Sequence, residues 1–331
     1  MARAVASEHP PLAPRAGWRL VAAKELADHL LSARFAVLLI LLGLAVAGTV
    51  YAAATGIRDV APEATGTPAL FLRLFTVSPG ERVPAFFGLV GFLAPLLGIA
   101  FGFDAVNSER SQGTLPRLLS QPIHRDDVVN GKFAAGLAVI ALILGGITML
   151  VAGLGMLRLG IVPTTSEVLR ILAWLALAVV YVGFWLAFAS LLSVVVERAA
   201  TAALVAIAAW LVLTLFFGLL VGLVADGLAP VPEQATAGEV IRNIQLQLNL
   251  ARLSPSTLYE EATIVLLNPE VRTLTPAFLL LPEQIDRAVR GTLPLTQSLL
   301  LIWPQVVGLV ALTILCFAAA YVSFMRQEVR A

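Results

Sequence analysis

The residues best placed for chemistry lie in one polar segment, residues 104–132, between two long apolar runs. Its nearest approach to a phosphate-binding loop is Asn130-Gly131-Lys132-Phe133. Position 126 is Asp where such a loop has its first glycine, and no Ser or Thr follows the lysine. These four residues therefore cannot wrap a nucleotide phosphate. We predict that the chain does not hydrolyse ATP and carries no catalytic residue.

The same segment contains a short helix signal. Thr114 is a helix-capping residue type, Pro116 is tolerated in a first turn, and Pro122 disfavours helix just before it. The helix should have under two turns, with Leu115, Leu118 and Leu119 on one face. An exposed apolar patch on a short loop usually marks a contact with another protein. The alternative is that the patch packs under the chain's own helix ends.

Other reactive groups are scarce. His9, His29 and His124 lie outside the apolar runs, and Cys316 is the single cysteine, so we expect no metal site and no disulfide. No Asp, Glu, Lys or Arg lies centrally in an apolar run, which disfavours ion-coupled carriers and intramembrane hydrolases. Within the runs, Gln305 is expected to bond between helices or, alternatively, to contact a substrate. Asp104, at the end of a run, is expected to pair with Arg110 or Lys132.

The composition is that of a membrane protein. Of 331 residues, 59% are hydrophobic and 13% are charged, against about 25% charged in soluble domains. The net charge is +1, so no basic field exists to hold nucleic acid. A span needs about 20 apolar residues. Six runs qualify: Phe35–Ala54, Ala85–Phe103, Phe133–Leu157, Ile171–Val196, Ala199–Ala225 and Ser298–Met325. We predict an all-α integral membrane protein.

Basic residues predict the orientation. With the N-terminus inside, 12 of the 22 Lys and Arg residues lie on the inner side and 10 on the outer side. Five of the outer residues lie in the long segment 226–297, which translocates largely regardless of charge. Without those five, 12 basic residues lie on the inner side and 5 on the outer side. Both termini are therefore predicted to be cytoplasmic, in a prokaryotic plasma membrane.

Two flanking segments carry helix patterns of their own. Before the first run, apolar and charged residues alternate around Trp18, which suits a helix lying in the inner membrane interface; a soluble arm is the alternative. In the outer segment we predict helices over Glu239–Leu253 and Ser256–Leu267, with a Thr257/Glu260 capping box and a stop at Asn268-Pro269. We expect them to form a helical cap; a solvated loop is the alternative.

The inner segment resembles the permease subunits of type-2 ABC exporters, in particular the branch associated with multi-copper-enzyme maturation. The likeness rests on Glu109-Arg110-x-x-Gly113-Thr114-Leu115-x-x-Leu118-Leu119-x-x-Pro122-Ile123-x-Arg125, followed by Gly131-Lys132. The six-span layout also looks like that family. Pro116 and the long outer segment depart from the commoner pattern.

The resemblance implies a transporter subunit that works with a second permease copy, in a homodimer or heterodimer, and with two separate ABC ATPase subunits, which bind ATP and Mg. This chain would bind no cofactor itself. Transferred to this sequence, the ATPase-coupling residues are Glu109, Arg110, Leu115, Leu118 and Leu119. A non-transporting membrane anchor or scaffold and an ion-coupled carrier are the alternatives. No substrate-binding residue is assigned.

These expectations divide the chain into four parts. Residues 1–33 form the arm and interfacial helix, and residues 34–225 hold spans one to five with the coupling loop 104–132. Residues 226–297 form the outer helical segment, and residues 298–331 form the sixth span and tail.

Overall fold

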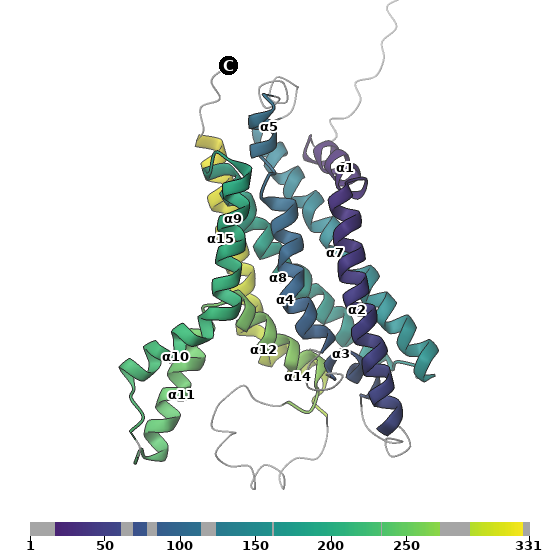
Figure 1. The fold of residues 1–331 in the computed structure, drawn as a ribbon, viewed down its shortest axis with the longest axis vertical. Helices are drawn as coiled ribbons and strands as arrows, with labels where there is room; N and C mark the ends of the chain where they lie inside the picture. Colours follow the sequence, from purple (N-terminus) through teal and green to yellow (C-terminus); the bar gives the residue numbers. More distant parts are fainter. Residues whose placement is uncertain are drawn as a thin grey trace, which may run out of the picture.

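The structure is a computed structural model that describes residues 17–60, 69–77, 85–113, 124–160, 162–232, 234–271 and 292–326. Every regular element in these ranges is helical, so the predicted all-α class is confirmed. Figure 1 shows a bundle of long helices running in roughly one direction. We call its two ends the α5 end, where α1 and α5 lie, and the α12 end, where α3, α12 and α14 lie.

The apolar runs form the long helices of the bundle. These are α2 (Ala33–Val60), α4 (Phe86–Gly102), α7 (Arg125–Leu159), α8 (Thr165–Val195), α9 (Ala199–Leu211) continuing through a π-helical turn η3 (Val212–Phe216) into α10 (Phe217–Leu228), and α15 (Trp303–Arg326). Five segments in the described residues are long and apolar enough to cross a membrane. A sixth candidate is α1 (Gly17–Leu30) with the first part of α2, bent by 61°. The chain is therefore a multi-pass membrane protein with five or six candidate spans.

Helix α8 is the centre of the bundle. It packs against α4, α7, α12 and α15, and its side chains Trp174, Tyr181 and Trp185 are fully buried. Gly98 and Gly102 of α4 allow a close approach to α8: a Cβ on Gly98 would lie 2.5 Å from the Val182 carbonyl oxygen. Gly218 and Gly222 have the same spacing, but no atom of the described chain lies near their Cβ positions.

Helix α1 lies across the α5 end and packs on α7. Val21 fits against Gly131, where a Cβ would come within 2.6 Å of the valine Cβ, so the contact requires glycine. The side chains of Trp18 and Leu20 on α1 are exposed, as is that of Leu31 directly after it. An exposed apolar edge on a helix bent away from its span agrees with the predicted interfacial position.

The segment between α10 and α15 forms α11 (Ala237–Ala251), α12 (Pro255–Leu267) and α14 (Leu295–Leu301). The two predicted helices exist and α12 ends before Asn268, as expected. The predicted cap of α12 was wrong: Ser254 caps it, with Pro255 in the first turn. A Thr236/Glu239 capping box starts α11 instead. Helix α12 is no solvated loop, because it is largely buried against α8 and α15.

The sixth predicted span is interrupted. The sequence suggested one helix from Ser298 to Met325, but α14 ends at Leu301 and α15 starts at Trp303. Pro304 follows at once. Its ring has no N–H to donate and clashes with the carbonyl four residues earlier, which explains the break. Two short elements, η2 (Leu70–Leu72) and α3 (Arg73–Thr76), precede α4.

Candidate functional site

The candidate coupling segment begins in α5 (Asn107–Ser111), which follows α4 after a tight turn. Two of the predicted coupling residues, Glu109 and Arg110, lie on α5. The other three, Leu115, Leu118 and Leu119, lie outside the described residues. Their placement on an exposed helical face therefore stays a prediction, and the described site is the base from which that segment extends.

A lysine joins this base to two other helices. The Nζ of Lys132 on α7 lies 2.9 Å from Glu109 Oε1 on α5 and 3.0 Å from Glu25 Oε1 on α1. All three side chains are shielded, with 10% exposure for Lys132, 16% for Glu109 and 13% for Glu25. We call Glu25, Lys132 and Glu109 the lysine-centred cluster. Ion pairs shielded in this way are screened little by salt.

The electrostatics keep Glu25 ionised. Burial alone would raise the pKa of Glu25, but the nearby ammonium groups of Lys132 and Lys24 lower it below its usual value. Burial lowers the pKa of His29, one turn further along α1, where its ring packs edge-on against Phe101. Near neutral pH Glu25 is therefore a carboxylate, and the His29 imidazole beside the cluster is neutral.

The start of α5 is also fixed to α8 and α15. The backbone N–H groups of Val106 and Asn107 donate to Ser193 Oγ on α8, at 2.9 and 3.2 Å. Val106 is buried in a small apolar cluster with Val129, Val194 and Phe324, which come from α7, α8 and α15. Helix α5 is thus held by the ends of three other helices, and by α1 through the lysine-centred cluster.

Asp104 does not pair as the sequence suggested. We expected Arg110 or Lys132 as its partner, but Asp104 Oδ2 lies 2.6 Å from Arg34 Nη1 at the start of α2. Lys132 is occupied by the two glutamates. Arg34 also lies over the ring of Phe103. The pair fixes the turn between α4 and α5 to α2, so the first span also reaches the coupling base.

The α12 end is held by a buried guanidinium. Arg170, near the start of α8, is 2% exposed. Its Nη1 donates to the Leu266 carbonyl oxygen at 3.0 Å and to Ser298 Oγ at 3.2 Å, and its Nη2 donates to the Leu293 carbonyl oxygen. These acceptors come from α12, from α14 and from the chain before α14. One side chain therefore holds the α12 end of the bundle together.

A hydroxyl network joins α12 to the fifth candidate span. Ser254 Oγ donates to the Leu213 carbonyl oxygen of η3 at 2.9 Å. Ser256 Oγ lies 3.1 Å from both Thr214 Oγ1 of η3 and Tyr181 Oη of α8. A π-helical turn leaves a carbonyl outside the regular helix pattern, and such turns frequently mark functional sites. Here the turn connects span five to the helix that fills the α12 end.

Gln305 has a partner between helices. Its Nε2 donates to Glu261 Oε2 of α12 at 2.8 Å, and Glu261 also accepts from Arg252 Nε at 2.9 Å. The expectation of an interhelical hydrogen bond is confirmed. This bond attaches α15 to α12. Helix α12 therefore has polar contacts with α8, η3 and α15.

Comparison with known proteins shows the family of this chain. Residues 19–329 match the family described as ABC-2 family transporter protein. The chain belongs to the ABC-2 transporter family. A curated relative, "Probable ABC transporter permease protein NosY" from Stutzerimonas stutzeri, is 30% identical over 151 residues. The match covers 44% of this chain and 52% of the relative, so the chain spans about half the length of that protein.

This ABC-2 family chain holds functional candidates that its sequence did not single out. Lys132 was noted in the family-like pattern, but nothing linked it to Glu25. Arg170 looked like an ordinary charge at the edge of a loop. The only local signals were the shared polarity of the helix ends and the position of Arg170 directly before an apolar run, where a charge that becomes buried needs partners.

Proposed function

We propose that this chain is the transmembrane permease subunit of an ABC transporter that exports its substrate. It pairs with a second permease copy around a translocation path, and two separate ATPase subunits drive it. Membership of the ABC-2 family supports a transporter. The relative is named as an ABC transporter permease, which supports the permease role. ATP and Mg would be bound by the ATPase partners, because Asn130 to Phe133 lie within helix α7 and lack the residues that wrap a phosphate.

The observation that carries the proposal is the way α5 is held. The lysine-centred cluster, the Ser193 hydrogen bonds and the Asp104–Arg34 pair connect this short helix to α1, α2, α7 and α8. A force applied to the loop that follows α5 would reach several spans together. A membrane anchor has no need for such a connection, whereas a permease moved by an external ATPase does.

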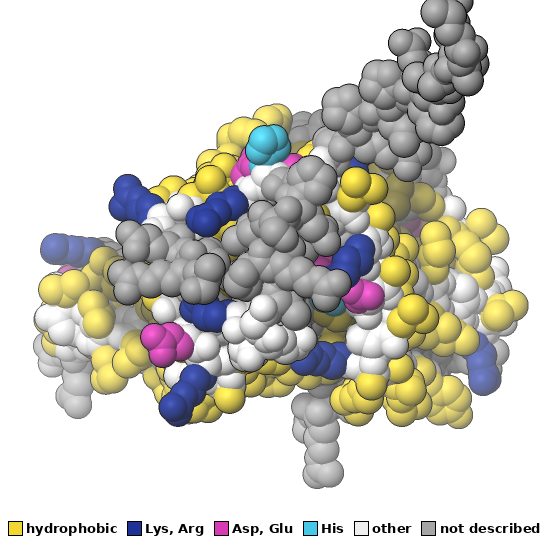
Figure 2. All heavy atoms as spheres, turned by 90° about the horizontal axis from the view of Figure 1, so that it is seen from above, with side chains coloured by type: hydrophobic (Ala, Val, Ile, Leu, Met, Phe, Trp, Pro, Cys, Tyr) yellow, Lys and Arg dark blue, Asp and Glu magenta, His cyan; other side chains and the backbone are white. Residues whose placement is uncertain are grey.

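We place the α5 end and both chain termini on the cytoplasmic side. Figure 2 views the molecule from this end, where Lys and Arg side chains lie over the surface among hydrophobic ones. The exposed basic residues at this end include Arg19, Lys24, Arg34 and Arg198. Basic residues are enriched in cytoplasmic loops of membrane proteins. The ATPase would then dock on the part of residues 104–132 between α5 and α7, with Arg110, Leu115, Leu118 and Leu119 as its contacts, while Glu109 fixes the base of that segment through Lys132.

Replacing Leu118 with aspartate should release the ATPase. Burying a leucine in a groove of the partner is worth about 1.5–3 kcal/mol. An unpaired carboxylate in that groove adds a desolvation cost of several kcal/mol. We expect the ratio of ATPase to permease after purification to fall by more than tenfold, which corresponds to about 1.4 kcal/mol. Permease abundance should stay normal.

Glu197→Gln is the control for this experiment, because Glu197 is exposed at the same end of the bundle, between α8 and α9, and lies outside the docking segment. Asp127 is unsuitable, since its carboxylate accepts from the backbone N–H groups of Trp18 and His124. If Leu118→Asp keeps its ATPase at the wild-type ratio, residues 104–132 are not the docking surface. If it loses abundance instead, Leu118 packs within this chain.

A further inference from the structure

Helices α10 and α11 form a hairpin that stands apart from the bundle. Figure 1 shows the pair extending sideways and outward beyond α12. Val221 and Ala225 of α10 are buried in the hairpin, and a polar seam aligns the pair. In this seam Asn243 Nδ2 donates to Asp226 Oδ1 at 3.0 Å and to the Ala229 carbonyl oxygen at 2.8 Å. These hydrogen bonds fix how α10 and α11 are aligned with each other in the hairpin.

Most of α10 is exposed and apolar. Five large side chains on it are between 48% and 72% exposed: Leu219, Leu220, Leu223, Val224 and Leu228. This helix is also the last part of the candidate span Ala199–Leu228. Exposed leucines around the end of a span are surfaces for lipid acyl chains. Leu228 and Ala229 then mark the depth at which the span meets the lipid headgroups.

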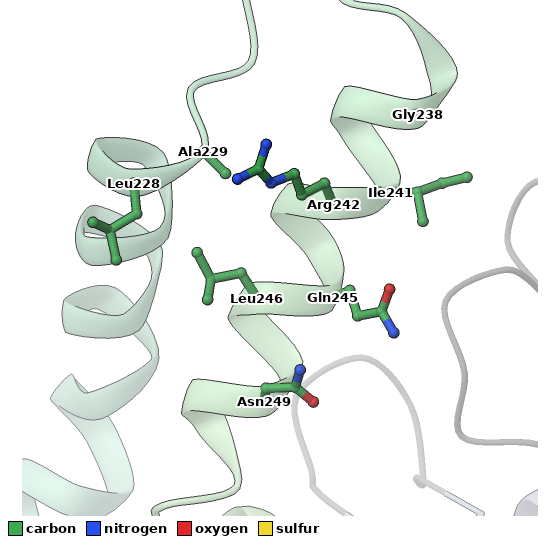
Figure 3. A pocket seen from close by; sticks show the side chains of 8 residues that line it. All are labelled: Leu228, Ala229, Gly238, Ile241, Arg242, Gln245, Leu246 and Asn249. Atoms are coloured by element: carbon green, nitrogen blue, oxygen red, sulfur yellow. The ribbon is translucent and has the colours of Figure 1, made fainter.

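A groove of about 610 Å³ lies at that depth between the end of α10 and α11. Figure 3 shows Arg242 and Leu246 reaching from α11 toward Ala229 and Leu228. Gln245 and Asn249 line the groove further along α11. Gly238 borders it and leaves open space where a side chain would stand. The groove thus has apolar walls toward α10 and hydrogen-bond donors along α11.

The donors of this groove have no partner in the described structure. Arg242, Gln245 and Asn249 recur every three or four residues and so share one face of α11. None of their side chains makes a hydrogen bond or an ion pair with another described residue. The carboxylates in the described part of the hairpin are engaged elsewhere, because Asp226 accepts from Asn243 in the seam and Glu239 closes the capping box with Thr236. The charge of Arg242 is left to face the groove.

We propose that this groove binds the headgroup of an anionic phospholipid. The phosphate accepts hydrogen bonds from Arg242, whose planar guanidinium matches phosphate geometry, and the amides of Gln245 and Asn249 donate to the remaining headgroup oxygens. The acyl chains lie along the exposed leucines of α10. A free phosphate ion would use the donors but not this adjoining apolar surface. The site is independent of ATP-driven transport, so it stands or falls separately from the proposed function.

Lipid retention on the purified chain tests the proposal. The protein is reconstituted in nanodiscs of phosphatidylcholine and phosphatidylglycerol, and bound lipid is measured by native mass spectrometry after partial delipidation. We expect wild type to retain phosphatidylglycerol in preference to phosphatidylcholine. The amount of phosphatidylglycerol retained by Arg242→Gln should be about tenfold lower, because one charge-assisted contact is lost. Arg242→Lys should keep most of it. Inorganic phosphate in excess should not displace the lipid.

Two further variants make the outcome decisive. Gln245→Glu adds a carboxylate on an exposed helix position, so it should fold and still repel the lipid phosphate. Equal retention by wild type, Arg242→Gln and Gln245→Glu would overturn the proposal. So would efficient disulfide formation between two copies carrying Gln245→Cys in a Cys316→Ala background, because the groove would then be covered by a second copy instead of lipid.

Discussion

Replacing Arg170 with leucine should cause the largest loss of stability of any single change at the α12 end. The buried guanidinium donates to the Leu266 and Leu293 carbonyl oxygens and to Ser298. Leucine leaves those two carbonyl oxygens without this donor in a shielded site, and each costs about 1–3 kcal/mol. We therefore expect a loss of about 2–6 kcal/mol, seen as a lower thermal midpoint of the purified chain.

Two control variants, Leu172→Ala and Arg170→Lys, show whether the hydrogen bonds of Arg170 cause that loss. Leu172→Ala alters an exposed residue two positions later on α8 and should leave the midpoint nearly unchanged. Arg170→Lys keeps the charge but loses the fork of donors, so it should fall between wild type and Arg170→Leu. A midpoint for Arg170→Leu equal to that of Leu172→Ala would show that the bonds of Arg170 do not hold α12 and α14.

Replacing Lys132 with glutamate should disconnect the coupling base. The change would put three carboxylates together where two ion pairs of 2.9 and 3.0 Å now exist. Breaking a shielded ion pair by removing one partner costs about 3–5 kcal/mol. Helices α1 and α5 should separate from α7, with lower thermal stability and loss of most ATP-driven transport. Both quantities can be measured on the reconstituted complex.

Charge reversal separates this ionic role from general damage. Combining Lys132→Glu with Glu25→Lys restores an opposite-charge pair between α1 and α7. The double variant should recover part of the stability and transport that Lys132→Glu loses. Lys132→Met is the neutral control and should be intermediate. Wild-type transport in Lys132→Glu would refute a role for the lysine-centred cluster in transmitting motion.

The sequence predicted the long helices well because a span depends on a local property, a run of apolar residues. The fourth run was predicted as Ile171–Val196 and α8 is Thr165–Val195. The apolar run Ser298–Met325 was predicted as one helix, but the helix is broken at Ile302. Pro304 causes this break although the run is apolar throughout. The cap of α12 was misplaced because two candidate residues, Ser254 and Thr257, lie one turn apart and tertiary contacts favour the first.

The candidate site was only partly predictable, because its contacts join distant residues. Glu25 and Lys132 are 107 positions apart, and Arg170 and Ser298 are 128 apart. No local pattern links such pairs. Helix α12 buries Arg170 by packing against the bundle, and this packing cannot be predicted from the apolar runs of the sequence. Glu109 could be named through the resemblance alone, and its partner became visible only in three dimensions.

ATP-dependent opening at the α12 end tests the central claim most directly. Ile264 on α12 is 40% exposed. In a Cys316→Ala background, Ile264→Cys is reacted from outside with a membrane-impermeant thiol reagent in the complex with its ATPase. An ATP-driven permease predicts a labelling rate several-fold higher when the ATPases are trapped closed with nucleotide than without it. Equal rates in both states, in a complex that hydrolyses ATP, would contradict the account.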